Sequence, residues 1–194
     1  MKKVDKLGGI MNAVIENIKS RRSTRNFTEQ SVEQNKLDAI IEAGLWAPSA
    51  VNKQSWHFTV IQNRDFMNRI NKATKEASSK SDIENVRNIA SNDKLDIFYG
   101  APSVIIVSST KDAMLPIMDI SAASQNMLLA AESLELGTCW IGLVSMLFNL
   151  MPEHEIIKEF NLPEGVKPSH AIVVGYKGHN GNAPERREGT VQYL

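Results

Sequence analysis

The sequence predicts an α+β domain of the three-layer α/β type, in which helices flank a central mixed β-sheet. Short, almost unbroken apolar runs at residues 103–109, 138–144 and 169–174 are typical of buried strands. Longer segments between these runs carry apolar residues at helical spacing. Strands that alternate with longer helices indicate a sheet covered by helices.

The first two helices are predicted from apolar periodicity. Apolar residues between Met11 and Ile18 recur at helical spacing, which predicts a helix that runs on into the basic residues 21–25. Ser31 to Gln34 resembles a capping box, which would open a second helix. That helix would carry its apolar residues on one face: Leu37, Ile40, Ile41 and Leu45.

The middle of the chain is predicted to hold a loop, a strand and a third helix. Residues 47–55 show no periodicity, whereas residues 56–62 alternate and are rich in β-forming types. Apolar residues from Phe66 to Ala77 then recur at helical spacing. The polar stretch 78–98 follows, and its composition favours a mobile lid or an insertion.

The C-terminal half supplies the longest helix. Residues 117–136 are rich in alanine and predict a helix that Gly137 ends. Residues 152–160 predict a brief helix before the last apolar strand. A Gly-rich, charged tail follows that strand.

Composition and charge limit the classes of function. The 194 residues are 42% hydrophobic and 23% charged, with 22 basic and 22 acidic side chains. We expect a flexible lead-in over residues 1–10 and a single domain over residues 11–194. Balanced charge argues against a nucleic-acid or anionic-membrane partner. A single cysteine, Cys139, and the lack of a long apolar stretch favour a soluble protein of the reducing cytoplasm.

No familiar metal or catalytic motif is complete, so we predict no metal site and no catalytic side chain. His154 opens a segment like a zinc-protease helix, but Lys158 stands where the second histidine belongs. No G-x-G-x-x-G fingerprint follows a strand. The histidines are scattered and suggest no nucleophile–base pair.

The segment RRSTR, residues 21–25, concentrates positive charge in a chain with no net charge. Arg21 and Arg25 lie four residues apart and would share a face if the helix continued, with Ser23 between them. Guanidinium groups bind phosphate through paired hydrogen bonds, and a serine hydroxyl adds a donor. The residues alone leave two interpretations open, a phosphate site and a solvated helix end.

The loop APSAVNKQSW, residues 47–56, carries small polar groups able to read the edge of a planar ring. Ser49, Asn52 and Gln54 present these groups after a stiff Pro48. The alternative is a turn that caps itself through serine and asparagine. Two tryptophans flank the loop and are interpreted as core anchors rather than ligand-stacking residues: Trp46 and Trp56.

Together these segments resemble the flavin-dependent nitroreductase family, the small FMN-binding oxidoreductases. The resemblance covers about Met11 to Leu194 and rests on four motifs in the family's order. These motifs are R-R-S-T-R (21–25), A-P-S-A-V-N-K-Q-S-W (47–56), L-G-T-C-W-I-G (136–142) and G-Y (175–176) with Arg187 after it. The chain departs from the family at Ser55, where a proline is usual, and in its tail, which lacks the common Gly-Tyr-Pro.

The resemblance implies which residues would bind FMN. The phosphate would be held by a cluster and one tail arginine: Arg21, Arg22, Ser23, Arg25 and Arg187. The isoalloxazine would be lined by the loop of the other subunit: Pro48, Ser49, Ala50 and Asn52, with Gln54 nearby. The backbone of Ile141 and Gly142 would face the reactive N5 edge. The resemblance thus implies an intertwined homodimer with FMN sites at its interface.

The implied activity is a ping-pong oxidoreductase reaction. Flavin N5 would take a hydride from NADH or NADPH and pass it to an electron-poor acceptor, such as a nitroaromatic or a quinone. The alternatives are a reductive dehalogenase or flavin-fragmenting enzyme of the same superfamily, a non-catalytic FMN-binding sensor, and a structural domain without cofactor. A bound phosphate dianion explains the local positive charge, so we favour the phosphate interpretation of residues 21–25.

Overall fold

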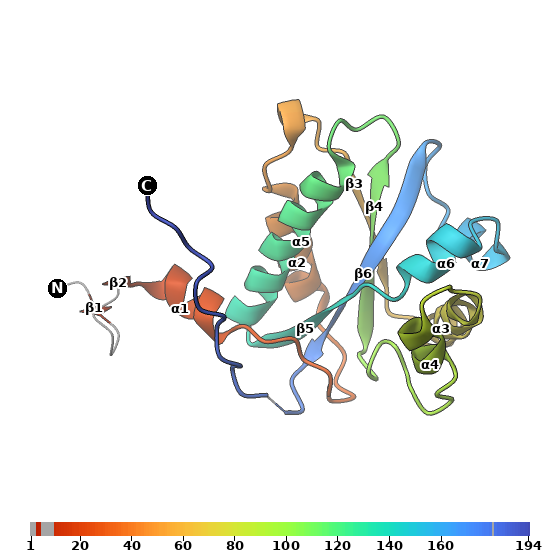
Figure 1. Cartoon of the computed structure of the whole chain (residues 1–194), viewed down its shortest axis with the longest axis horizontal. Coiled ribbons are helices and arrows are strands. Elements are labelled where there is room, and N and C mark those ends of the chain that lie inside the picture. Colours follow the sequence, from red (N-terminus) through yellow and green to blue (C-terminus); the bar gives the residue numbers. More distant parts are fainter. Residues whose placement is uncertain (1–2, 5–9, 180) are drawn as a thin grey trace.

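The computed structural model describes residues 3–4, 10–179 and 181–194, and a four-stranded sheet lies at its centre (Figure 1). Most of the lead-in expected over residues 1–10 falls outside the described residues. In chain order the elements are β1 (Lys3–Val4), β2 (Ile10–Met11), α1 (Ala13–Ser20), α2 (Gln34–Leu45), η1 (Ala50–Asn52), β3 (Trp56–Ile61), α3 (Arg64–Ser79), α4 (Glu84–Ala90), β4 (Ser103–Thr110), α5 (Pro116–Ser133), β5 (Leu136–Ile141), α6 (Ser145–Leu150), α7 (Glu155–Lys158) and β6 (Val166–Tyr176).

The sheet has the order β3-β4-β6-β5, and each neighbouring pair runs antiparallel. All four predicted strands are confirmed, although β5 ends at Ile141 and β6 is longer than its apolar run. The mixed character expected of the sheet is limited to a parallel bridge between Ser23 and Thr138 of β5. This bridge places the arginine segment directly beside the sheet.

Helices cover both faces of the sheet, which confirms the predicted three-layer architecture (Figure 1). Side chains of β4 alternate between the faces, as a pleated strand requires. Val104 and Ile106 pack with residues of α3, α6 and α7, whereas Ile105 and Val107 pack with residues of α2 and α5. All four are fully buried, so β4 is the strand buried on both faces that its composition predicts.

The long helix α5 ends earlier than predicted. It stops at Ser133, and Glu135 then adopts a left-handed conformation with φ of 64°. Gly137 therefore does not end the helix, and it lies inside β5 instead. The chain turns from α5 into β5 at Glu135, and not at Gly137 as the sequence pattern predicts.

The first helix and the start of the second also differ from expectation. The helix α1 ends at Ser20, so Arg21 and Arg25 do not share a helical face. Helix α2 begins at Gln34 with Glu33 as its N-cap residue and without a side-chain cap. The predicted capping box is wrong because the Gln34 amide donates to Asp38 instead, at 2.7 Å.

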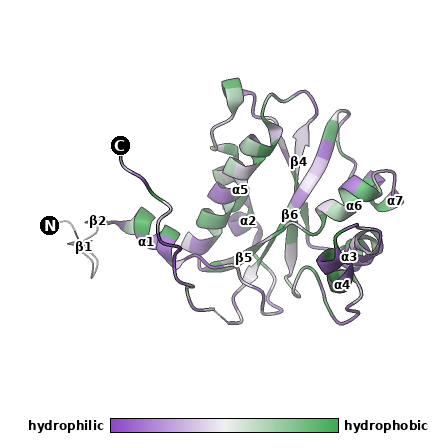
Figure 2. Ribbon diagram, viewed as in Figure 1, coloured by the Kyte–Doolittle hydropathy of each residue, from purple (hydrophilic) through white to green (hydrophobic). Residues whose placement is uncertain are grey.

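The polar stretch after α3 is more ordered than its composition indicates. It contains α4, which packs against α3. The brief helix predicted at 152–160 shortens to α7, and α6 before it was not predicted. Hydrophobic residues, green in Figure 2, also occur in α1 and η1, which lie at the margins of the fold. Among the described residues, no helix is long and apolar enough to cross a membrane.

Candidate functional site

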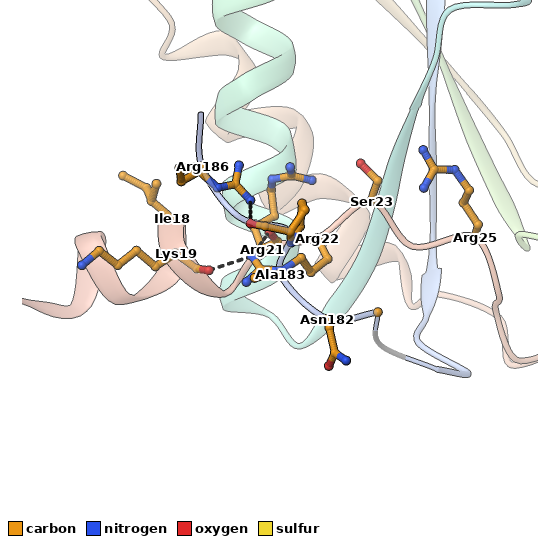
Figure 3. A pocket seen from close by; sticks show the side chains of 11 residues that line it. Ile18, Lys19, Arg21, Arg22, Ser23, Arg25, Asn182, Ala183 and Arg186 are labelled. Carbon is orange, nitrogen blue, oxygen red and sulfur yellow. Dashed lines mark hydrogen bonds between the residues drawn. The ribbon is translucent and has the colours of Figure 1, made fainter. Parts of the chain in front are cut away.

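A pocket of about 780 Å³ lies where the end of α1 meets the C-terminal tail (Figure 3). One wall comes from residues 18–25 and the other from residues 181–186. Basic side chains dominate the lining, and the described lining residues include no carboxylate: Ile18, Lys19, Arg21, Arg22, Ser23, Arg25, Gly181, Asn182, Ala183, Pro184 and Arg186. We call this space the arginine pocket, and its charge suits a phosphate or another small anion.

The end of α1 brings the arginines to this pocket. Arg22 donates from Nη1 to the carbonyl oxygens of Lys19 and Arg21, both at 2.7 Å, and so satisfies acceptors that the helix end leaves open. Beyond this point the chain extends, and Ser23 pairs with Thr138 of β5. The arginines are therefore positioned by the end of α1 and by the edge strand β5, and not by one face of a continuing helix.

The arginine pocket gathers four of the five side chains predicted at the phosphate: Arg21, Arg22, Ser23 and Arg25. Arg187 is not among the residues that line it, and the neighbouring Arg186 is. Arg186 lies beside Arg21 and Arg22, whereas Arg25 lies apart, across β5 (Figure 3). The tail thus contributes an arginine to the cluster one position before the predicted residue.

A smaller pocket of about 140 Å³ shares Arg25 with the arginine pocket. Its walls include the end of β5, with Ile141 and Gly142, and the segment that follows α3. The Arg25 guanidinium lies 5.9 Å from the ring centroid of Tyr99 in that segment. Three apolar side chains complete the segment's contribution: Ile89, Leu95 and Ile97. The stretch predicted as a lid therefore lines the pocket where Ile141 and Gly142 were predicted to face a ring.

Cys139 also lines the smaller pocket, but its thiol has low reactivity. The side chain is buried, and burial raises the pKa of the thiol against the opposing effect of nearby Arg25. A thiol held in its neutral form is a poor nucleophile. Cys139 therefore serves as a small apolar residue, in agreement with the sequence interpretation.

The loop 47–54 lies far from the arginine pocket. The backbone N–H of Ala50 donates to Asp119 Oδ1 at 2.9 Å, near the start of α5. Asn17 of α1 donates to the carbonyl of Leu129, ten residues further along the same helix. That separation corresponds to about 15 Å of helix. One chain therefore holds the loop and the arginines toward opposite ends of α5 (Figure 1).

The loop itself is compact and backbone-strained. Asn52 and Gln54 both adopt left-handed conformations, with φ of 53° and 49°. Gln54 donates from its side chain to Asn52 Oδ1 at 3.1 Å and from its backbone to Ser49 Oγ at 2.9 Å. These bonds match the self-capping turn considered as the alternative. Strained residues of this kind persist where the surroundings hold them, often at binding sites.

Large apolar side chains around this loop face solvent within the single chain. Trp46 is 79% exposed, so its interpretation as a core anchor is wrong, whereas Trp56 packs against the core. Leu45 is half-exposed rather than buried on the face of α2. Further exposed apolar residues come from the loop and the start of α5: Val51, Met114, Leu115, Ile117 and Met118. Patches of this kind usually mark an interaction surface.

Asp119 fixes the loop and was missed by sequence reasoning. It is 3% exposed, and it accepts from the Ser55 hydroxyl at 3.0 Å as well as from Ala50. A carboxylate in the first turn of a helix also interacts favourably with the helix dipole. The available signal is an acidic side chain close to the apolar start of the alanine-rich segment 117–136.

A buried histidine supports the strand that carries Ile141. The rings of His170 and Trp140 stack with centroids 4.1 Å apart and an interplanar angle of 12°. Ser124 donates to the carbonyl of Ile120, so His170 Nε2 donates to Ser124 Oγ, at 2.8 Å. Burial lowers the pKa of His170 to about 4. The imidazole is therefore neutral near pH 7.

The sequence and the fold both match known proteins. The model of the nitroreductase family matches residues 18–176. A Methanothermobacter thermautotrophicus protein with the provisional name NADH dehydrogenase/NAD(P)H nitroreductase is 34% identical over 172 residues, which span 86% of this chain and 78% of that protein. The FMN reductase (NAD(P)H) of Bacillus subtilis is 31% identical over 86% of this chain and 66% of its own length.

A solved nitroreductase with bound FMN from Bacteroides fragilis superposes with a TM-score of 0.87. It is 32% identical and covers 95% of this chain and 100% of its own. The resemblance inferred from the four sequence motifs is confirmed. The chain belongs to the nitroreductase family.

Proposed function

We propose that the chain is a flavin oxidoreductase that binds FMN, takes electrons from NADH or NADPH and reduces electron-poor acceptors. One observation carries the proposal: the arginine pocket and the smaller pocket at the end of β5 share a lining residue, Arg25. A phosphate and a planar ring need two such adjoining environments, one strongly basic and one largely apolar. FMN-bound and NAD(P)H-linked relatives support the same assignment.

The described residues fit FMN. Arg21 and Arg186 would bind the phosphate, and the Ser23 hydroxyl would add a donor. Backbone amides at Ile141 and Gly142 would face the ring edge, and oriented amides of this kind stabilise developing negative charge. When bound, FMN would supply the two-electron chemistry that links the nucleotide donor to a nitroaromatic or quinone acceptor. The side chains around it bind, orient and exclude water.

The acceptor would contact the segment after α3. Ile89 and Leu95 offer apolar contact, and the Arg25 guanidinium above Tyr99 offers a positive charge near the same space. An aromatic ring with electron-withdrawing oxygen atoms matches both features. This arrangement favours nitroaromatics and quinones over aliphatic acceptors.

The visible absorption spectrum tests the proposed function. We expect purified protein to show flavin bands that bleach when NADH or NADPH is added without oxygen. The bands should return when a nitroaromatic or quinone follows. Flavin bands that neither nucleotide bleaches would instead favour the sensor or the dehalogenase-type reading. A protein that stays colourless after incubation with FMN would overturn the proposal.

We further propose a homodimer in which each FMN site takes its loop from the second copy. The loop 47–54 and the arginine pocket lie toward opposite ends of α5, so one chain does not bring them together. The exposed apolar residues around the loop need cover, and a two-fold pairing would supply it at both sites. The helix α1 has no buried residue, and the second copy would also cover this helix.

Subunit mixing tests the shared site. Arg21→Ala and Asn52→Ala chains should each lose most activity as homodimers. After exchange, half of the dimers are mixed and each mixed dimer has one intact site, so activity should recover to about one quarter of wild type.

Mixing Arg21→Ala with Arg25→Ala is the matched control, because both changes lie on one side of the site and no intact site can form. Equal recovery in both mixtures, or none in the first after verified exchange, would contradict the shared site. An Asn52→Ala homodimer with full activity would remove the loop from the site.

A further inference from the structure

The arginine segment, residues 21–28, packs against two glycines of the sheet, Gly137 of β5 and Gly175 of β6. Between Ser23 and Thr28 the chain crosses the ends of β5 and β6, and backbone hydrogen bonds hold it there. The N–H of Thr24 donates to the carbonyl of Thr138 at 2.8 Å, and the N–H of Thr28 donates to the carbonyl of Tyr176 at 3.0 Å. The segment therefore takes its position from the sheet rather than from α1.

Gly137 of β5 lies directly against Thr24. A Cβ atom at this position would lie 2.6 Å from Thr24 Oγ1 and 2.8 Å from Thr24 Cβ and Cγ2. Thr24 is 3% exposed and branched at Cβ, so no rotamer moves all three atoms away. Any side chain at residue 137 must displace the backbone of the arginine segment.

Gly175 of β6 supports the other end of the segment in the same way. A Cβ atom there would lie 2.5 Å from Pro102 Cδ and 2.9 Å from Phe27 Cδ1. The Pro102 ring is fixed to its own backbone and cannot turn aside, and the half-buried Phe27 ring packs against the core. Two glycines on adjacent strands thus fix both ends of residues 24–27.

Thr24 and the pocket-lining residues alternate along the extended segment. Ser23 and Arg25 line the arginine pocket, whereas Thr24 between them packs into the sheet at Gly137. A shift of Thr24 therefore moves its two neighbours together. The tail is tied to the same segment, because the N–H of Gly178 donates to the carbonyl of Asn26 at 3.0 Å.

We propose that Gly137 is a positioning residue that makes the site selective for a phosphorylated flavin, through its contact with Thr24. This inference rests on the proposed FMN site. Phosphate recognition by guanidinium groups depends on geometry at the level of tenths of an ångström to an ångström. Displacement of Ser23 and Arg25 should therefore weaken binding of the phosphate more than binding of the ring.

The experiment compares FMN with riboflavin, which lacks the phosphate. Apo-protein is titrated with each flavin, and quenching of flavin fluorescence gives both dissociation constants. In Gly137→Ala we expect FMN affinity to fall about tenfold or more while riboflavin affinity changes less than about threefold. The double variant Thr24→Gly/Gly137→Ala removes the overlapping atoms and should restore most of the preference for FMN.

Gly44→Ala is the matched control. A Cβ atom at Gly44 would also be crowded, at 2.9 Å from Met127 Cγ, but on α2 and away from the arginine segment. It should leave the ratio of the FMN and riboflavin dissociation constants at the wild-type value even if stability falls.

Equal weakening of both flavins by Gly137→Ala, or no rescue by the double variant, would overturn the inference and leave the proposed FMN site standing. Wild-type protein that binds FMN no better than riboflavin would overturn the inference and the proposed phosphate site together. If Gly137→Ala does not fold, the double variant must fold and retain the preference for FMN, and its failure to do so counts against the inference.

Discussion

Arg21→Ala is expected to weaken FMN binding by about a hundredfold while riboflavin binding stays within a few-fold of wild type. Arg21 lines the arginine pocket beside Arg186, and the described lining residues include no carboxylate that would repel a phosphate. A phosphate dianion would then face one guanidinium fewer in a partly enclosed space. Titration of apo-protein with each flavin, at low and at high salt, measures the effect.

Two tail variants sharpen this test. Arg186 lines the pocket and Arg187 does not, so Arg186→Ala should weaken FMN binding by about tenfold and Arg187→Ala should have little effect. The reverse order would restore the residue predicted from the family motif. Equal losses of FMN and riboflavin in Arg21→Ala would show that the arginine holds the fold and not the phosphate.

His170 should make the protein sensitive to acid. Its pKa is lowered by burial to about 4, below the ordinary value of 6.5 that applies in the unfolded chain. As the pH falls from 6.5 to 4, the unfolded chain therefore takes up the proton first. The free energy of unfolding should drop by about 3 kcal/mol through this residue alone, and it should not change through His170 above pH 6.5.

Urea unfolding of His170→Gln at several pH values isolates this contribution from other titrating groups. The variant should lose about 3 kcal/mol less than wild type between pH 7 and pH 4. Ser124→Ala is the matched control, because it removes a hydrogen bond at 2.8 Å but keeps the buried imidazole. It should therefore remain acid-sensitive. Wild-type and His170→Gln curves that run parallel would contradict the prediction.

The sheet was predictable from sequence because its strands are short and almost wholly apolar. Val104 to Val107 are all fully buried, and such a run has few other places in a small domain. Helix ends were less predictable. The sequence pattern predicts a helix stop at Gly137, but the left-handed residue is Glu135, and Gly137 lies against Thr24 instead. That contact joins residues far apart in sequence, so no local pattern reveals it.

The candidate site was predictable in composition but not in geometry. Residues 21–25 carried enough charge to suggest a phosphate site, and four of their side chains do line one pocket. The role of Asp119 depends on where α5 meets the loop, which spacing along the chain does not show. The size of Trp46 predicts a core position, whereas the single chain leaves its side chain exposed. Residue type alone does not tell whether a large apolar side chain is buried in the core or exposed on the surface of the chain.

The strand order has a consequence for the chain as it leaves the ribosome. The central strand β4 pairs with β6, and β6 does not begin until Val166. Until then the nascent chain carries the SVIIVSST segment with one row of its backbone hydrogen-bonding groups unpaired. A segment so apolar and β-forming is prone to aggregate. Productive synthesis therefore depends on rapid completion of β6, or on a chaperone that shields β4 until β6 has been made.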